Sequence, residues 1–222
     1  MTTFPPPVVA WRGDADGTSP LVVLLHGRGS DETDIIALAD QLPPSYVYAA
    51  PRAPIGEGGG YAWFANRGIG RPVAASLTDT MDWFRSWLDQ VAPPGRSVVL
   101  VGFSGGGAFA GGLILDEPGR YVGAAILYAT LPFDAGVPIT ARRLAGLPVL
   151  VVHGDVDTVI PRELLERTWT YLHDEAGSIT TGARDPGGHG ISPAAVGGLR
   201  HWLEALATQG AGAVPRSSGG GS

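Results

Sequence analysis

The chain contains no cysteine and no lysine, and its apolar runs are short. The absence of cysteine excludes a thiol nucleophile, a disulfide framework and a thiolate metal site, and we expect no metal centre. All fifteen basic residues are arginine, which excludes a P-loop lysine, a lysine Schiff base and a Ser-Lys dyad. These absences remove several chemistries that compete with a serine nucleophile.

Charge and hydropathy narrow the expected partners and location. The formal net charge of -6 argues against a nucleic-acid partner, because phosphate binding needs a basic face. The longest apolar runs, such as 21–25 and 149–152, have the length of a strand and are well short of a membrane span. Residues 1–11 show no basic segment followed by an apolar one, so we expect a cytoplasmic protein unless an export signal has been removed.

Short β-branched runs alternate with helical patterns along most of the chain. Strands are predicted at 8–12, 21–26, 46–50, 97–103, 123–128, 148–153 and 178–182, and helices at 31–41, 76–91, 106–115, 161–175 and 192–207. Several strands are apolar on both faces, which is typical of a parallel sheet covered by helices on both sides. We therefore predict one doubly wound α/β domain over 1–208 and a flexible C-terminal tail or linker over 209–222.

A serine between two glycines follows one of the predicted strands directly. Ser104 has Gly102 and Gly106 two residues away on either side, and a small-residue helix is predicted to begin at Gly106. This arrangement predicts a nucleophile elbow, a sharp strand-to-helix turn in which side chains at the two glycines would collide with neighbouring backbone. The serine hydroxyl would then project from the sheet beside the helix N-terminus.

A serine nucleophile needs a histidine base, and five histidines compete for that role. Two of them, His173 and His201, lie in helical patterns, while His26 and His153 end apolar strands and have little freedom to reach Ser104. His189 lies in the glycine-rich loop 185–190, which can present its ring to the serine. We therefore predict His189 as the general base.

The orienting acid is predicted in the turn after the strand at 148–153. Asp157 is the choice, because it lies in the turn and Pro161 then begins a helix. Asp155, two residues nearer the strand, is expected to hold the turn together through backbone amides. The resulting order Ser104, Asp157, His189 differs from the orders found in chymotrypsin-type and subtilisin-type enzymes.

The oxyanion hole is expected to combine two backbone amides. The amide of Gly105 follows the nucleophile directly, and the turn formed by Gly27 and Gly29 would aim the amide of Arg28 at the same position. The side chain of Arg28 would point elsewhere. A strand-to-helix turn without catalytic duty is the alternative for this loop.

Four separated motifs together resemble the phospholipase/carboxylesterase family of α/β-hydrolases. They are LHGRG at 25–29, GFSGG at 102–106, HGDVD at 153–157 and GHG at 188–190, and the resemblance extends from residue 21 to about 206. The resemblance implies an α/β-hydrolase fold and hydrolysis of esters or thioesters without a cofactor. Thioesterases of this family usually carry glutamine directly after the nucleophile, where this chain has Gly105.

We accordingly expect a serine esterase that acts on a small-molecule ester with a short to medium acyl chain. Few residues separate the strands at 123–128 and 148–153, which leaves no material for a sizeable lid. Thioesterase, lysophospholipase, amidase or polyester-degrading activity and a non-catalytic binding protein remain alternatives, and the oligomeric state stays open, with a homodimer among the options. Predicted apolar walls of the cleft are Tyr61, Trp63, Phe64, Leu131 and Phe133.

Overall fold

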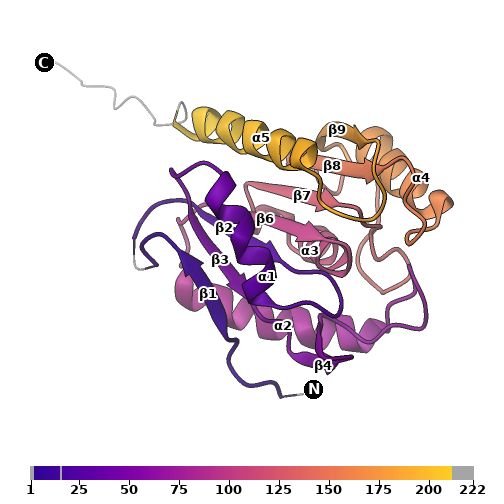
Figure 1. Ribbon diagram of the computed structural model, residues 1–222, viewed down its shortest axis with the longest axis horizontal. Coiled ribbons are helices and arrows are strands. Elements are labelled where there is room, and N and C mark those ends of the chain that lie inside the picture. Colours follow the sequence, from indigo (N-terminus) through magenta and orange to yellow (C-terminus); the bar gives the residue numbers. More distant parts are fainter. Residues whose placement is uncertain (1–2, 16, 212–222) are drawn as a thin grey trace, which may run out of the picture.

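A seven-stranded sheet crosses the centre of the protein in the computed structural model, which describes residues 3–15 and 17–211 (Figure 1). Its strand order is β1-β3-β2-β6-β7-β8-β9. Strand β1 pairs antiparallel with β3, and every other neighbouring pair in this sheet is parallel. The carboxyl ends of β2, β6, β8 and β9 therefore point to one edge, where loops can bring distant residues together.

The strands of the main sheet are β1 (Val9–Arg12), β2 (Leu21–Leu25), β3 (Val47–Pro51), β6 (Val98–Phe103), β7 (Gly123–Leu127), β8 (Pro148–Gly154) and β9 (Ile179–Asp185). A separate two-stranded hairpin consists of β4 (Ile55–Glu57) and β5 (Gly60–Ala62). The helices are α1 (Glu32–Ile36), α2 (Ala74–Val91), α3 (Gly105–Asp116), α4 (Arg162–Thr170) and α5 (Pro193–Ala211), with short 3-10 helices η1 (Ala37–Gln41) and η2 (Pro118–Arg120) and a π-helical segment η3 (Tyr171–Glu175).

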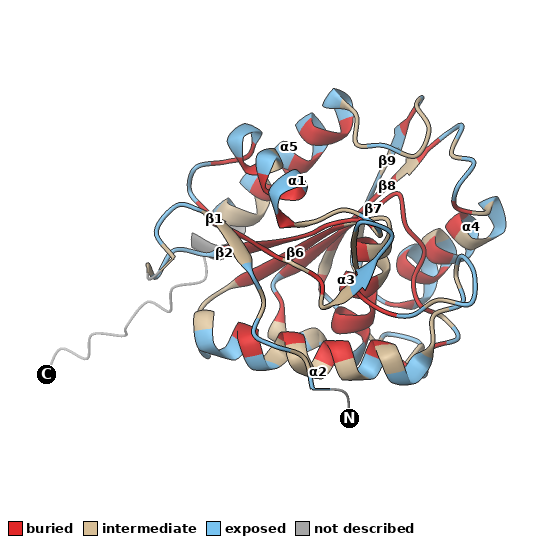
Figure 2. Cartoon of the chain, turned by 60° about the horizontal axis from the view of Figure 1, so that its bottom comes forward, coloured by how far each residue is buried: buried red, intermediate tan, exposed pale blue. Residues whose placement is uncertain are grey.

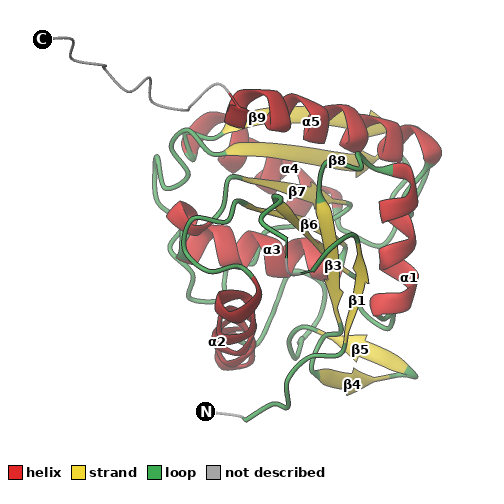
Figure 3. Cartoon of the chain, turned by 90° about the vertical axis from the view of Figure 1, so that its left-hand side faces the viewer, coloured by secondary structure: helices red, strands yellow, loops and turns green. Residues whose placement is uncertain are grey.

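Two apolar cores lie on opposite faces of the sheet. In β2, Leu21, Val23 and Leu25 pack into the core that contains α2 and α3, while Val22 and Leu24 pack into the core that contains α1 and α5 (Figure 3). Successive side chains of a strand point to opposite faces, so a strand covered on both sides is apolar throughout. All five β2 residues are completely buried, and Figure 2 shows the inner strands as the buried centre of the molecule.

The predicted elements differ from the structure mainly at their ends. Helix α2 begins at Ala74 after an N-cap at Val73, so Ser76 lies inside the helix and does not cap it. Its hydroxyl instead accepts a hydrogen bond from the Ala65 amide at 2.9 Å. Strand β9 extends to Asp185, and the small β4–β5 hairpin was not predicted.

The predicted α/β-hydrolase fold class is confirmed by the mostly parallel sheet with helices on both faces.

Helix α5 continues to Ala211, so 209–211 belongs to this helix and not to the predicted tail, while 212–222 lies outside the described residues. Among the helices of the described part of the chain, none combines the length and apolar character needed to cross a membrane.

Candidate active site

Ser104 lies between β6 and α3, where the chain turns sharply from sheet to helix. Its φ of 52° and ψ of -117° belong to a region that favours glycine, so the backbone is strained at this serine. The Ser104 amide donates to the Leu127 carbonyl at 2.9 Å, which ties the turn to the neighbouring strand. A β-carbon at Gly102 would lie 2.2 Å from the Gly106 carbonyl oxygen, so the close approach that was predicted for the two glycines is present.

The three residues predicted from separate motifs form one hydrogen-bonded chain. The Ser104 Oγ lies 2.8 Å from His189 Nε2, and His189 Nδ1 lies 2.8 Å from Asp157 Oδ2. Because Nδ1 faces a carboxylate, it carries the ring proton, and Nε2 is left to accept the hydrogen of the serine hydroxyl. The Asp157 side chain is fully buried and the His189 side chain is 14% exposed, so the imidazole is accessible from outside and the carboxylate is not.

The Asp157 carboxylate also holds its own turn together. Its Oδ1 accepts hydrogen bonds from the amides of Val159 at 2.8 Å and Ile160 at 3.0 Å, which leaves Oδ2 for His189. Burial by itself raises the pKa of this carboxyl, but the hydrogen bonds from His189, Ile160 and Val159 outweigh burial and hold the pKa below its ordinary value. Asp157 is therefore ionised at neutral pH.

Asp155 does not hold the turn through its side chain, which corrects the sequence prediction. Its side chain lies at the surface, with Oδ1 3.4 Å from Arg184 Nε. Its amide donates to the Asp185 carbonyl at 2.7 Å and so extends the β8–β9 ladder. The turn begins only after this point, and Asp157 is the residue that reaches its amides.

Asp185, the last residue of β9, anchors the loop that carries His189. Its buried carboxylate accepts hydrogen bonds from the Gly187 amide at 2.8 Å and from the Tyr128 hydroxyl. Hydrogen bonds from Ser192, Tyr128 and Gly187 lower the pKa of Asp185. Asp185 was not among the residues predicted from the sequence, although an aspartate directly before Pro-Gly-Gly is typical of a side chain that bonds a turn amide.

Side-chain and backbone packing fix the position of the His189 loop. The Phe103 and His189 ring centroids are 5.2 Å apart, and the Tyr128 ring lies edge-on to His189 at 6.3 Å. A β-carbon at Gly154 would lie 2.4 Å from the Gly188 carbonyl oxygen, so the loop rests directly on the end of β8. The base is therefore packed on several sides before any substrate binds.

The amides of Arg28 and Gly105 adjoin each other beside Ser104. Gly105 is the first residue of α3, so its N–H has no acceptor within the helix. A β-carbon at Gly105 would lie 3.3 Å from the Arg28 amide nitrogen, which shows how closely the two segments approach. Two backbone donors next to a serine hydroxyl can stabilise a negative oxygen.

The β4–β5 hairpin holds the Arg28 loop in place. The Gly29 amide donates to the Tyr61 carbonyl at 2.9 Å, and the Tyr61 amide donates to the Ser30 carbonyl at 3.0 Å. The Arg28 guanidinium points away from Ser104 and binds the Glu57 carboxylate and the Phe64 carbonyl. The Arg28 guanidinium is therefore already occupied by these two partners.

His26 is a structural histidine beneath the same loop. Its Nε2 accepts a hydrogen bond from the Ala53 amide at 3.1 Å, so Nδ1 carries the proton and donates to the Gly27 carbonyl at 2.8 Å. Burial lowers the pKa of this imidazole, which stays neutral. The Trp63 indole donates to the His26 carbonyl at 2.8 Å and adds a further link.

The other histidines lie away from the serine. His153 points into a hollow between α4 and β9, and burial lowers its pKa to about 4, with Arg184 lowering it further and Asp157 opposing. His173 stacks on Trp169 at 4.8 Å, and His201 is exposed on α5. Only His189 among the five contacts Ser104.

A narrow cleft of about 60 Å³ opens beside Ser104, and its lining is mostly apolar. Phe64 and Leu131, two of the five predicted wall residues, belong to it. Eight further lining residues were not predicted from the sequence: Asn66, Ile69, Gly70, Pro72, Ala108, Thr130, Pro132 and Ile160. Half of these residues come from the loop between β5 and α2, which has no regular pattern to reveal its position.

The other three predicted wall residues pack elsewhere, which corrects the prediction. Trp63 is 1% exposed and stacks on Phe109 at 4.6 Å within the core. Tyr61 lies under the Arg52 guanidinium, and Phe133 lies under that of Arg167. Trp63 and Phe64 are neighbours in the bend after β5, where the Trp63 ring joins the core and Phe64 reaches the cleft.

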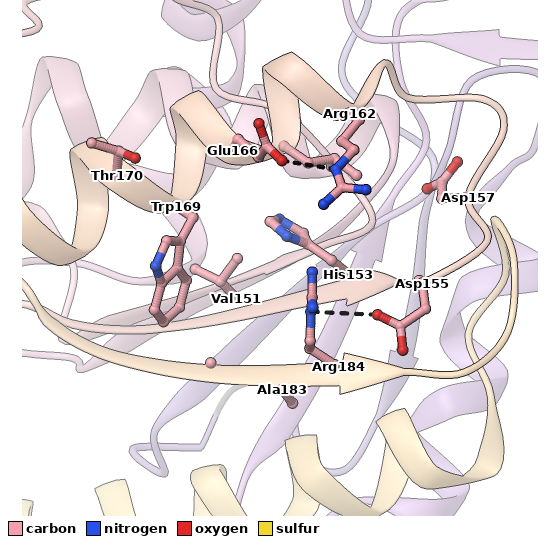
Figure 4. Close-up of a pocket in the computed structure, with 13 residues that line it drawn as sticks. Val151, His153, Asp155, Asp157, Arg162, Glu166, Trp169, Thr170, Ala183 and Arg184 are labelled. Carbon is pink, nitrogen blue, oxygen red and sulfur yellow. Dashed lines mark hydrogen bonds and ion pairs between the residues drawn. The ribbon is translucent and has the colours of Figure 1, made fainter.

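A second and larger hollow of about 660 Å³ lies on the far side of the Asp157 turn, between α4 and β9 (Figure 4). Asp157 forms part of its wall, but the carboxylate is turned to His189. The two arginines at this hollow are paired with carboxylates, Arg162 with Glu166 at 2.8 Å and Arg184 with Asp155. The linings of this hollow and of the cleft beside Ser104 share no residue, so the two are separate.

A serine on a strained strand-to-helix turn of a mostly parallel sheet defines an α/β-hydrolase. The chain belongs to the phospholipase/carboxylesterase family, whose model matches residues 12–207. The predicted family resemblance is thereby confirmed.

Comparison with individual proteins agrees with this assignment. MhqD of Bacillus subtilis (strain 168), whose own assignment as a hydrolase is provisional, is 27% identical over 194 residues, which cover 85% of this chain and 94% of MhqD. A carboxylesterase from Mesorhizobium loti is 28% identical, with a TM-score of 0.75 over 83% of this chain and 88% of that one. A Bacillus cereus carboxylesterase, 22% identical, shares the fold with a TM-score of 0.80 over 90% of this chain and 94% of its own.

Proposed function

We propose that this protein is a serine hydrolase that cleaves carboxylic esters of short to medium acyl chains through an acyl-enzyme on Ser104. The observation that carries the proposal is the chain of two 2.8 Å contacts from Ser104 through His189 to the buried Asp157. The adjoining amides of Arg28 and Gly105 support it, because acyl transfer needs donors where negative charge develops.

In the first half of the reaction, Ser104 Oγ bonds to the ester carbonyl carbon while His189 Nε2 takes the serine proton. The carbonyl oxygen becomes an oxyanion between the amides of Arg28 and Gly105. Asp157 keeps the imidazole in the required tautomer and stabilises its positive form. The imidazolium then gives its proton to the alkoxy oxygen, the ester C–O bond breaks and the alcohol leaves.

Water completes the second half. A water molecule adds to the acyl carbon and gives a proton to His189, and the oxyanion forms again at the same two amides. When the bond to Ser104 breaks, the serine oxygen takes that proton back and the carboxylic acid leaves. One ester and one water molecule enter these steps, and one alcohol and one carboxylic acid leave.

The size of the cleft supports short to medium acyl chains. Its volume of about 60 Å³ is far below the several hundred Å³ of pockets that enclose a drug-sized ligand. Each acyl methylene gains about 0.8 kcal/mol only while it is buried, so carbons beyond the apolar walls add little.

The direct test combines labelling with turnover. We expect a fluorophosphonate probe to label the wild-type protein at Ser104, and Ser104→Ala to remain folded, unlabelled and slower by at least about 10³-fold in kcat on p-nitrophenyl butyrate. Acyl thioesters, amides and polyester films assayed beside the esters identify the preferred bond. Labelling at a different serine, or ligand binding without turnover of any substrate, contradicts the proposal.

A further inference from the structure

Asn66 is the single asparagine of the chain and lies at the cleft beside Ser104. One of its side-chain atoms is buried and has no hydrogen-bond partner in the described part of the chain. Its side-chain Oδ1 is inaccessible to solvent and accepts no hydrogen bond from the described residues. The residue lines the cleft together with Ser104. An unpaired buried oxygen is costly, and in a native protein such a group needs an explanation such as a functional role or a bound water or ion.

The other polar side chains of this lining already have partners. Arg28 binds Glu57 and the Phe64 carbonyl, and Ser104 binds His189. The Thr130 hydroxyl donates to backbone carbonyl oxygen and accepts from Thr168. Within the described lining, Asn66 is therefore the polar side chain that is left for a substrate.

Backbone contacts hold the segment that carries Asn66. The Val73 amide donates to the Ala65 carbonyl at 2.8 Å, and Asn66 forms a β-bridge with Pro72. The Ala65 amide donates to Ser76 of α2. Because the backbone at Asn66 is already held, binding a substrate does not have to order this segment, which favours recognition.

We propose that Asn66 determines specificity, and that the preferred substrates are carboxylic esters with a hydroxyl group near the scissile bond. This inference rests on the proposed esterase function. A hydroxyl both donates and accepts, so it can pair with the carboxamide in either orientation of its oxygen and nitrogen. An ionised group would instead be buried unpaired among Phe64, Leu131 and Pro132.

The experiment compares esters that differ only by hydroxyl and methyl. One pair varies the alcohol, 2-hydroxyethyl butanoate against propyl butanoate, and one varies the acid, methyl 3-hydroxybutanoate against methyl 3-methylbutanoate. The variant Asn66→Leu removes the amide at similar volume. Gln90→Leu is the matched control, because Gln90 is exposed on α2 and its amide donates to the Ser86 carbonyl.

We expect wild type and Gln90→Leu to favour the hydroxylated ester of at least one pair by about tenfold in kcat/KM, and Asn66→Leu to bring that ratio to about one or below. A wild-type ratio near one in both pairs overturns the inference, and so does a ratio that Asn66→Leu leaves unchanged. Each ratio compares two substrates on the same protein sample. Partial misfolding of the variant lowers both rates equally and does not change the ratio. If wild type hydrolyses none of the four esters, the esterase proposal itself fails.

Discussion

At the scale of single residues, Asp157 combines two functions that substitutions can separate. Asp157→Asn keeps an oxygen for the Val159 and Ile160 amides but turns an N–H donor toward His189 and so favours the wrong tautomer. We expect kcat to fall about 10³- to 10⁴-fold with little change in melting temperature. Asp157→Ala removes the acceptor of both amides as well, so it should also lose about 1 to 3 kcal/mol of unfolding free energy.

Kinetics and thermal melting of the two variants, with Asp155→Asn as control, provide the measurement. The Asp155 side chain faces Arg184 at the surface, and an exposed pair of this kind contributes about 0 to 1 kcal/mol. Asp155→Asn should therefore behave like wild type in both assays. A large kinetic effect at Asp155 with none at Asp157 would show that the acid has been assigned to the wrong aspartate.

His153 makes the stability of the fold sensitive to acid. Burial lowers the pKa of this imidazole from its ordinary value of 6.5 to about 4 in the folded chain, so between these values the unfolded chain binds a proton that the folded chain does not. The stabilisation is complete above pH 6.5 and is lost as the pH falls toward 4. The loss from this residue amounts to about 3 kcal/mol at most.

We expect His153→Gln to weaken the dependence of the unfolding free energy on pH between about 6.5 and 4. Urea unfolding at pH 7.0, 6.0, 5.0 and 4.5 measures it: the unfolding free energy of wild type should fall more steeply with acid than that of the variant. Buried His26 is retained in both proteins and contributes a loss of the same sign, so the variant should keep some slope. Parallel curves would mean that His153 titrates as it does in the unfolded chain.

At the scale of elements, Asp185 links β9 to the loop that presents His189. Asp185→Ala leaves the Gly187 amide and the Tyr128 hydroxyl without their acceptor. We expect this change to lower the melting temperature and to reduce kcat and the rate of fluorophosphonate labelling together by about tenfold or more, because a base displaced by even 1 Å reacts poorly. Asp174→Ala on the exposed end of η3 is the control. A change in stability alone would limit Asp185 to a structural role.

The sequence predicted those elements whose pattern is long or whose turn chemistry is unusual. The glycines around Ser104 and the Gly-His-Gly loop each reveal a backbone constraint, and the structure brings the residues they flank into contact. The β4–β5 hairpin was missed because its strands are three residues long and its segment is rich in glycine. Helix α2 begins at Ala74, two residues before the predicted start, and Ser76 lies inside it, where its hydroxyl accepts a hydrogen bond from the Ala65 amide.

The predicted cleft walls show a further limit of sequence reasoning. An aromatic residue close to a motif can belong either to the core or to the cleft, and the residue type does not distinguish the two. The direction of its side chain determines which of them it joins. Trp63 and Phe64 are adjacent in sequence, yet Trp63 joins the core and Phe64 reaches the cleft. Asn66 carried no sequence signal except that it is the single asparagine of the chain.

At the scale of the whole molecule, the small cleft and the absence of a cap in the described segment between β7 and β8 predict the response to acyl length. We expect kcat/KM on monomeric p-nitrophenyl esters to rise and then level or fall below about ten carbons, because carbons outside the cleft gain no burial. The same assay across the micelle concentration should show no jump in rate. A steady rise to palmitoyl esters would reveal a long acyl site elsewhere in the molecule.

The strained backbone at Ser104 lowers the thermal stability of the protein, while the proposed turnover requires the serine. At a φ of 52° glycine relieves strain of about 1 to 3 kcal/mol, while its freedom in the unfolded chain costs about 0.5 to 1 kcal/mol. Ser104→Gly should therefore melt above Ser104→Ala in calorimetry, and equal melting points would mean that the surrounding turn bears no strain. A library selected only for survival of heating would enrich glycine at 104 and discard the nucleophile. Selection of more thermostable variants of this protein therefore has to test for product formation before it tests for resistance to heating.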